Sequence, residues 1–378
     1  MASSRIVRIE WARLEGRRPR KAGCNARLGE HGQAVTTPVA RITTADGATG
    51  FGWAHIKPEQ AEALLGTTLD EALATPAILA GGIAEGYRAI EFPLFDLAAK
   101  VEGRPVYACL APATAPLRVP CYDTSLYMDD LHLASDAEAA DAIAAETVDG
   151  LAHGHRAFKL KVGRGAMHMD VEAGTRRDIA VIRAVRQVAG PDAPIMIDAN
   201  NGYNLNLTRR VLGETADVGI YWMEEPFHED GTLFGILKNW LAAEGLPTLI
   251  ADGEGDASSH LLEWTRRGLI DVVQYDVRHP GFSRWLELGP MLDGWGRGSA
   301  PHNYGEAYGN YASCHLAPFI SNFERVEWDA ADVDGLDASG YAIVDGAVAV
   351  PDAPGFGLAL DEAVFARAVR EGGFTVAV

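Results

Sequence analysis

From Leu117 onward, short apolar runs alternate with longer segments whose apolar residues follow helical spacing. The runs that we expect to be strands are 117–122, 156–162, 194–198, 220–224, 248–252, 272–276, 299–302 and 323–328. Helical segments separate most of them, so each strand is expected to lie parallel to the next. Eight strands alternating with helices predict a β/α barrel rather than a doubly wound sheet.

The residues before and after this repeat follow other patterns. Residues near 5–55 alternate as in an antiparallel β-meander, interrupted at 16–32 by a basic, glycine-rich stretch that we expect to be a mobile loop. Residues 59–110 have helical periodicity. In the tail, two apolar runs within 341–350 predict a hairpin that packs back on the N-terminal part.

These patterns together predict one fold class. We expect a modified (β/α)7–8 TIM barrel with an N-terminal α+β capping domain that the C-terminal tail completes. The predicted boundaries are 1–115 for the capping domain, 116–335 for the barrel and 336–378 for the tail. Active sites of such barrels lie at the carboxyl ends of the strands, so functional residues are expected there.

Two lysines interrupt the strand expected at 156–162. Because side chains alternate along a strand, Lys159 and Lys161 share one face, while Phe158 and Leu160 share the other. Two ammonium groups on an inner face need anionic partners, since burying an unpaired one costs roughly several kcal/mol. An edge strand with solvated lysines has the same pattern, so the prediction of a site depends on the strands that follow.

Most of the strand candidates end in a charged or imidazole group. Asp198, Glu224 and Glu254 fall on successive strands, and their oxygens are the donors that Mg²⁺ prefers. Asp276 precedes His302 by one strand, a pattern typical of a carboxylate that orients an imidazole and raises its basicity. The residues in phase with the strands are Lys161, Asp198, Glu224, Glu254, Asp276, His302 and Glu324. One of them alone would be commonplace, but seven predict a single catalytic mouth.

Composition narrows the class of protein and its partners. The 378 residues suffice for one large barrel with an appendage. No apolar run approaches the length of a membrane span, and residues 1–6 lack the apolar core of a signal peptide, so we expect a cytoplasmic protein without a membrane partner. The formal charge of −19 argues against nucleic acid as a partner. The four cysteines are scattered, which favours neither a disulfide framework nor a zinc site.

Taken together, these motifs resemble the mandelate racemase subgroup of the enolase superfamily, and the resemblance covers nearly the whole chain. It rests on Lys159-x-Lys161, Asp198-Ala199-Asn200, Trp222-Met223-Glu224-Glu225-Pro226, Gly253-Glu254, Asp276, His302, Glu324-Arg325 and the helix at 92–100. The resemblance implies a magnesium enzyme, working as a homo-oligomer, that removes the proton α to the carboxylate of a small-molecule substrate.

The resemblance also implies roles for individual residues. The implied metal ligands are Asp198, Glu224 and Glu254; the catalytic residues are Lys161, His302 and Asp276; and the substrate-binding residues are Lys159, Glu324 and Asn200. Lys161 would be the base on one face of the substrate, and His302 with Asp276 the acid or base on the other. Removing the α-proton places a second negative charge on the substrate, which the cation and the ammonium groups would stabilise.

Three functions are compatible with this set of residues. We favour dehydration of a sugar acid to a 2-keto-3-deoxy acid, because that is the commonest activity in proteins with this constellation. A racemase or epimerase of an α-hydroxy acid or related carboxylate would use the same Lys161 and His302 pair. A barrel that has lost catalysis predicts broken ligand sets, and none is broken here.

Some positions depart from the usual family pattern. The segment 163–177 is long, and Arg278 and His279 replace a more glycine-rich run, either as substrate contacts or in a loop salt bridge. Asp252 competes with Glu254 as the third metal ligand, and we prefer Glu254. The basic 16–32 stretch is expected to limit substrate length and to suit a hydroxylated or anionic distal end.

Overall fold

The computed structural model describes residues 4–75, 79–112 and 116–378. Within them, a parallel sheet follows the order β11-β4-β5-β6-β7-β8-β9-β10. Ser299 of β10 pairs with Phe323, just before β11, so the sheet closes on itself. The predicted barrel is therefore confirmed, and all eight strand candidates contribute to it.

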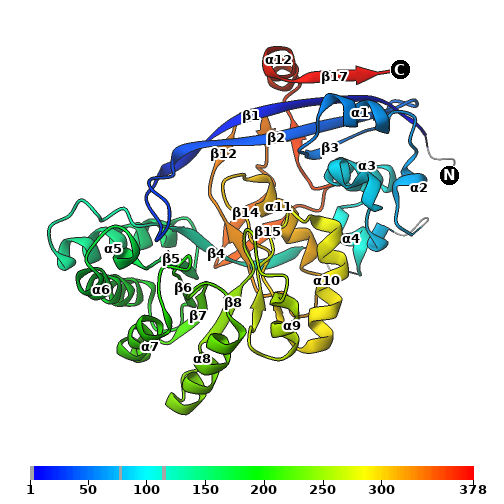
Figure 1. Ribbon diagram of the computed structural model, residues 1–378. Helices are drawn as coiled ribbons and strands as arrows, with labels where there is room; N and C mark the ends of the chain where they lie inside the picture. The colour runs from blue at the N-terminus through cyan, green and yellow to red at the C-terminus, as the bar shows by residue number, and fades with distance from the viewer. Residues whose placement is uncertain (1–3, 76–78, 113–115) are drawn as a thin grey trace.

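The barrel elements alternate as the hydrophobic pattern predicted. The strands are β4 (Leu117–Leu126), β5 (Phe158–Lys161), β6 (Ile195–Asp198), β7 (Ile220–Glu224), β8 (Leu249–Asp252), β9 (Val272–Val273), β10 (Gly298–Ser299) and β11 (Val326–Trp328). The helices between them are α5 (Asp136–Ala152), α6 (Val171–Ala189), α7 (Leu205–Glu214), α8 (Gly231–Glu244), α9 (Leu261–Arg266), α10 (Phe282–Trp295) and α11 (Tyr308–Leu316). They surround the strands on the outside (Figure 1).

Alternation along the strands separates two packing environments. One face packs on the helices through residues such as Phe158 and Ile197, which are fully buried in the main core. The other face fills the barrel interior with a small cluster that includes Met196, Trp222 and Ala251. The lysines of β5 belong to this inner face, so they point into the barrel and not to solvent.

A separate antiparallel sheet covers the barrel. It has the order β12-β1-β2-β3, and β17 also pairs with β1. Its strands are β1 (Ile6–Ala22), β2 (Gly32–Thr44), β3 (Thr49–Trp53), β12 (Asp332–Val333) and β17 (Phe374–Ala377). The long β1–β2 ribbon, in blue, passes over the barrel, and its tip descends toward α5 and β5 (Figure 1). This ribbon brings residues of the N-terminal sheet to the mouth.

The expectation of a mobile loop at 16–32 was wrong for residues 16–22 and for Gly32, which lie in strands. β1 continues to Ala22 and pairs with β2 through Arg17 opposite Ala34 and Ala22 opposite Gly32. Only residues 23–31 form the turn. The stretch is basic because one side of the ribbon faces solvent or acidic partners, and this polarity does not prevent main-chain pairing.

The remaining elements belong mainly to the helical part of the cap and to the tail. They are α1 (Pro58–Leu64), α2 (Leu69–Ala72), α3 (Glu91–Glu102), α4 (Val106–Leu110), β13 (Leu336–Asp337), β14 (Ala342–Val344), β15 (Ala347–Val350), β16 (Ala359–Leu360) and α12 (Glu362–Gly372), with 3₁₀ turns at Leu79–Gly81, Glu85–Ile90, Arg164–Ala166 and Ala216–Val218. Among the described residues, no helix combines the length and apolarity needed to span a membrane.

The tail returns to the cap by a different element from the one expected. The predicted hairpin forms as β14 and β15, but β15 pairs with β4 of the barrel, with Val348 opposite Val119. The expectation that this hairpin packs on the N-terminal part was therefore wrong. Instead β17 joins β1, with Ile9 opposite Val376. The domain boundaries at 115 and 335 stay predictions.

Candidate active site

Strand register brings the two lysines of β5 against acidic residues of β6 and β7. Lys161 lies opposite Asp198, and Asp198 lies opposite Glu224. Lys159 is 1% exposed, and its Nζ lies 2.5 Å from Glu224 Oε1 and 2.8 Å from Glu327 Oε1. Lys161 Nζ is ion-paired with Asp198 Oδ2. Since β5 lies between β4 and β6, the explanation as an edge strand with solvated lysines is excluded.

Three carboxylates form a group that suits a hard divalent cation. One oxygen each of Asp198, Glu224 and Glu254 lies within 4.8 Å of the others. Mg²⁺ binds oxygens at about 2.0–2.1 Å in octahedral geometry, so two ligands across the ion are about 4 Å apart, and the donor type and spacing fit. Gly253 has a φ of 130°, a conformation that favours glycine, and carries the chain from β8 to Glu254. Asp252 is 1% exposed and lies outside this group.

The pKa values around these carboxylates indicate that their negative charge is not fully balanced by neighbouring cations. Burial raises the pKa of Glu224 to about 8; the Lys159 ammonium opposes this, while the neighbouring Asp198 and Glu327 add to it. Burial works to lower the pKa of Lys161, but the Asp198, Glu254 and Glu224 carboxylates together raise it. A divalent cation bound to these carboxylates would relieve the repulsion among them, so the donor set fits such an ion in charge as well as in geometry.

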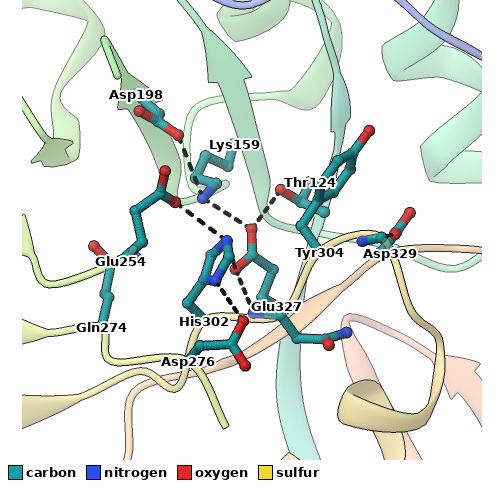
Figure 2. Close-up of polar contacts among 12 residues, drawn as sticks. Thr124, Lys159, Asp198, Glu254, Gln274, Asp276, His302, Tyr304, Glu327 and Asp329 are labelled. Atoms are coloured by element: carbon teal, nitrogen blue, oxygen red, sulfur yellow. Dashed lines mark hydrogen bonds and ion pairs between the residues drawn. The ribbon is translucent and has the colours of Figure 1, made fainter. Parts of the chain in front are cut away.

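His302 lies on the other side of the mouth, between carboxylates. Its Nδ1 lies 3.1 Å from Asp276 Oδ2, and its Nε2 lies 3.2 Å from Glu254 Oε2 and 3.9 Å from Glu327 Oε2 (Figure 2). Burial works to lower the pKa of His302, but Glu254, Glu327 and Asp276 together raise it to about 9. The imidazole is therefore a cation at neutral pH in this arrangement, held by Asp276 from behind.

The glutamate of the last barrel strand is Glu327, and the prediction of Glu324 was wrong in position. Glu327 is 1% exposed and accepts hydrogen bonds from Thr124 Oγ1 at 2.6 Å and from the Asn303 amide at 3.0 Å. Glu324 precedes β11 and accepts a hydrogen bond from Tyr221 Oη at 2.5 Å, at the amino ends of the strands. The strand begins at Val326 and not at Phe323, which moves the mouth-facing carboxylate three residues along the chain.

Comparison with known proteins decides the family. A family model described as "Enolase C-terminal domain-like" matches residues 141–364, more than half of the chain. The chain belongs to the enolase superfamily.

Solved structures of superfamily members align over the whole length. A galacturonate dehydratase from Geobacillus sp. is 48% identical, with a TM-score of 0.95, and the alignment covers 99% of each chain. A mandelate racemase/muconate lactonizing protein from Geobacillus sp. Y412MC10 is 47% identical, with a TM-score of 0.97, and covers 100% of this chain and 98% of its own. L-talarate/galactarate dehydratase from Salmonella typhimurium is 27% identical over 87% of this chain and 81% of its own length.

Asn200, expected to bind substrate, contacts the carboxylates of this superfamily site. Its Nδ2 donates to Glu225 Oε2 and to Glu254 Oε1, each at 3.0 Å. Asn201 Nδ2 donates to the other oxygen of Glu225 at 2.8 Å. The φ of Asn200 is 42°, a left-handed conformation that asparagine tolerates better than most residues. Asn200 therefore buttresses Glu254 in this structure, and a substrate contact stays a prediction.

The tip of the β1–β2 ribbon closes the mouth. Arg18 forms two hydrogen bonds of 2.9 Å with Asp329, and both side chains are buried. Ala26 is 1% exposed and lies against Gly163 and Gly202, where a Cβ at Gly202 would come within 2.5 Å of the Ala26 Cβ. An outer cleft of about 510 Å³ remains, lined by Asn25, Arg27, Leu28, Asn200, Asn201, Glu225, His228, Glu229, Glu254, Gly255 and Asp256. The cap and the barrel thus enclose the site together.

Sequence reasoning missed several residues that line the site. Gln274 Nε2 donates to Glu224 Oε2 at 2.8 Å, and the Tyr127 ring lies 5.4 Å from Lys161 Nζ. Thr124 binds Glu327 from β4. Gln274 precedes Asp276 by two residues in the strand expected at 272–276, so alternation was a usable signal for it. Tyr127 follows β4 directly and carried no signal beyond that position.

Proposed function

We propose that the protein is a magnesium-dependent acid-sugar dehydratase. The observation that carries this proposal is the placement of Lys161 and His302 on two sides of the Asp198, Glu224 and Glu254 group, inside a mouth that the cap covers. Relatives named as dehydratases of sugar acids support the reaction. Solved structures of relatives complexed with magnesium support the cation.

The residues of the chain supply the proton transfers and the binding of the substrate carboxylate. Bound magnesium would polarise that carboxylate and stabilise the charge that develops on it. Lys159, held by Glu224 and Glu327, presents a second positive charge at the same place. To take the α-proton, Lys161 or His302 must first be neutral, and a cation bound to Asp198 and Glu254 would lower the pKa of both groups by offsetting the charge of those carboxylates. The neutral one of the pair takes the α-proton, and protonated His302 gives a proton to the departing β-hydroxyl, so that water leaves and an enol remains.

The substrate that we infer is a hexuronate, a sugar acid with one carboxylate. The galacturonate dehydratase at 48% identity was solved with D-galacturonate and 5-keto-4-deoxy-D-galacturonate, which differ by one water. Arginines of the mouth are already paired, Arg18 with Asp329 and Arg278 with Asp276. Arg27 faces an outer cleft that is also lined by four acidic residues, Glu225, Glu229, Glu254 and Asp256. A second substrate carboxylate would therefore meet more negative than positive charge.

Proton NMR in deuterated buffer with magnesium tests the function against hexuronates, aldonates and aldarates. A keto-deoxy product from a hexuronate is the expected result, with no turnover after chelation of the metal. Loss of the α-proton signal without a new carbon skeleton would instead assign a racemase or epimerase, a reaction that the same pair of residues permits. Silence with all three classes would contradict both assignments.

We also infer a cytoplasmic, homo-oligomeric enzyme, supported by composition and by the family resemblance. Light scattering on a sizing column measures the assembly, and a monomer at micromolar concentration would refute it. Fractionation of the producing cell locates the protein.

A further inference from the structure

The loop after β9 carries an arginine that none of the roles above uses. Arg278 Nη2 donates to Asp276 Oδ2 at 2.8 Å, and its Nε donates to Asp276 Oδ1 at 3.2 Å. The Arg278 amide also donates to Oδ1, at 2.7 Å. The oxygen that Nη2 binds is the one that faces His302 Nδ1 at 3.1 Å. The guanidinium therefore holds, by a two-bond fork, the carboxylate that orients the imidazole.

The other side of Arg278 reaches the capping sheet. Its Nη1 lies 3.1 Å from Glu306 Oε2. Trp53 Nε1, at the end of β3, donates to the same Glu306 oxygen. A continuous series of polar contacts thus runs from Trp53 through Glu306, Arg278 and Asp276 to His302.

The nitrogens of Arg278 are occupied by protein acceptors. Besides Asp276 and Glu306, Nη2 donates to the Tyr304 carbonyl at 3.0 Å. The side chain is 11% exposed. Of the two roles that the sequence left open for Arg278, the contacts match the salt bridge in the loop, because each nitrogen of the guanidinium has an acceptor within the protein.

We propose that Arg278 is a positioning residue for the Asp276–His302 pair, and that Trp53 and Glu306 make the orientation of His302 depend on the docked cap. The inference rests on the proposed function in that His302 must act during turnover. A planar guanidinium fixes the plane of the carboxylate, which a lysine, as a point charge, does not do. Docking of the cap then closes the mouth and orients His302 at the same time. A substrate therefore meets an oriented imidazole only when the cap is docked on the barrel.

Steady-state kinetics of Arg278→Gln and Arg278→Lys test the first half of the proposal. Loss of an outer partner of a functional histidine typically costs about 10–100-fold in activity, and we expect this in kcat, with KM little changed, for both variants. Arg88→Gln is the matched control, because Arg88 Nη2 binds Glu287 at 2.6 Å between the cap and α10 without touching the pair. An unchanged kcat in Arg278→Gln overturns the proposal.

A double-mutant cycle tests the link to the cap. Trp53→Phe removes the indole donor and should lower kcat in the wild-type background but not in Arg278→Gln, because the effect passes through Arg278. An equal loss in both backgrounds overturns the link.

A readout that needs no turnover separates this proposal from the proposed function. In protein labelled with ¹⁵N-histidine, the Nδ1 proton of His302 is assigned by its absence in His302→Gln. We expect that proton signal to shift in Arg278→Gln and in Trp53→Phe and to stay in place in Arg88→Gln. A signal that stays in place in Arg278→Gln overturns the inference, whereas wild-type protein that turns over no acid sugar overturns the proposed function alone.

Discussion

Replacing Glu327 by Gln should inactivate the enzyme, whereas the same change at Glu324 should not. The two glutamates are three residues apart, so they make a matched pair with one chemical change. Glu327 accepts from Thr124 at 2.6 Å, from Lys159 at 2.8 Å and from the Asn303 amide at 3.0 Å. Glu324 accepts from Tyr221 at the far end of the barrel.

The size of the effect follows from what an amide cannot replace. In either orientation of a glutamine side chain at position 327, its NH₂ group faces another hydrogen-bond donor, which is either the Lys159 ammonium or the backbone N–H of Asn303. A charge-assisted hydrogen bond contributes about 1.5–3 kcal/mol, and breaking a buried ion pair costs about 3–5 kcal/mol. We therefore expect the free energy of unfolding to fall by about 2–4 kcal/mol, because Lys159 keeps Glu224 as a partner. Activity should fall by about 10²–10⁴-fold, since Lys159 and His302 both lose their common anion.

Urea unfolding and the NMR turnover assay measure the two effects on the same preparations. Glu324→Gln should unfold within about 1 kcal/mol of wild type, because the amide oxygen can still accept from Tyr221 and a charge-assisted hydrogen bond is only replaced by a neutral one. Its turnover should match wild type. Full activity in Glu327→Gln, or loss of activity in Glu324→Gln, would refute the placement of Glu327 at the reacting end of the barrel.

Three further predictions concern other charged residues. Lys161→Met should stop exchange of the substrate α-proton in deuterated buffer while the fold persists, and retained exchange would rule Lys161 out as the base on its face. In protein freed of metal by a chelator, the pKa of His302 is raised from 6.5 to about 9, so its ion pairs contribute their full stability below about pH 6.5 and lose it as the pH rises through 9. The Tm of the metal-free protein should therefore fall between pH 6.5 and pH 9, and this fall should be smaller in His302→Gln. Arg18→Gln leaves buried Asp329 without its fork and should cost about 3–5 kcal/mol of unfolding free energy in urea, whereas Arg183→Gln, at an exposed pair, should cost less than about 1 kcal/mol.

The barrel and most of its mouth could be predicted because one physical rule governs both. Strands buried on two faces read as short apolar runs, and parallel strands place their last residues at one edge. Asp198 and Glu224 follow directly from that rule, since each ends an apolar run, and His302 follows from its place at the end of the short candidate Ser299-Ala300-Pro301-His302.

The misplaced residues depend on partners that the local sequence does not contain. Glu324 and Glu327 lie on opposite faces of an extended chain, and only the closing register with β4, where Val326 lies opposite Cys121, selects between them. Residues 16–22 read as a loop because they are polar, and the acidic partners of Arg18 and Arg20, which are Asp329 and Glu146, lie far away in the chain. The hairpin at 341–350 has an edge that could pair with the barrel sheet or with the capping sheet. Local strand propensity does not select between the two sheets.

The pairing of β17 with β1 has a consequence for the newly made chain. Trp11 lies opposite Phe374, which is synthesised after all the barrel strands. β1 can pair with β2 as soon as both have been synthesised. The barrel strands from β4 to β11 then follow in order along the chain, and the barrel can close before β17 is available to pair with β1. The capping sheet therefore lacks its β17 edge until the barrel strands have been synthesised, and the pairing of β17 with β1 is the step that completes the sheet over the barrel.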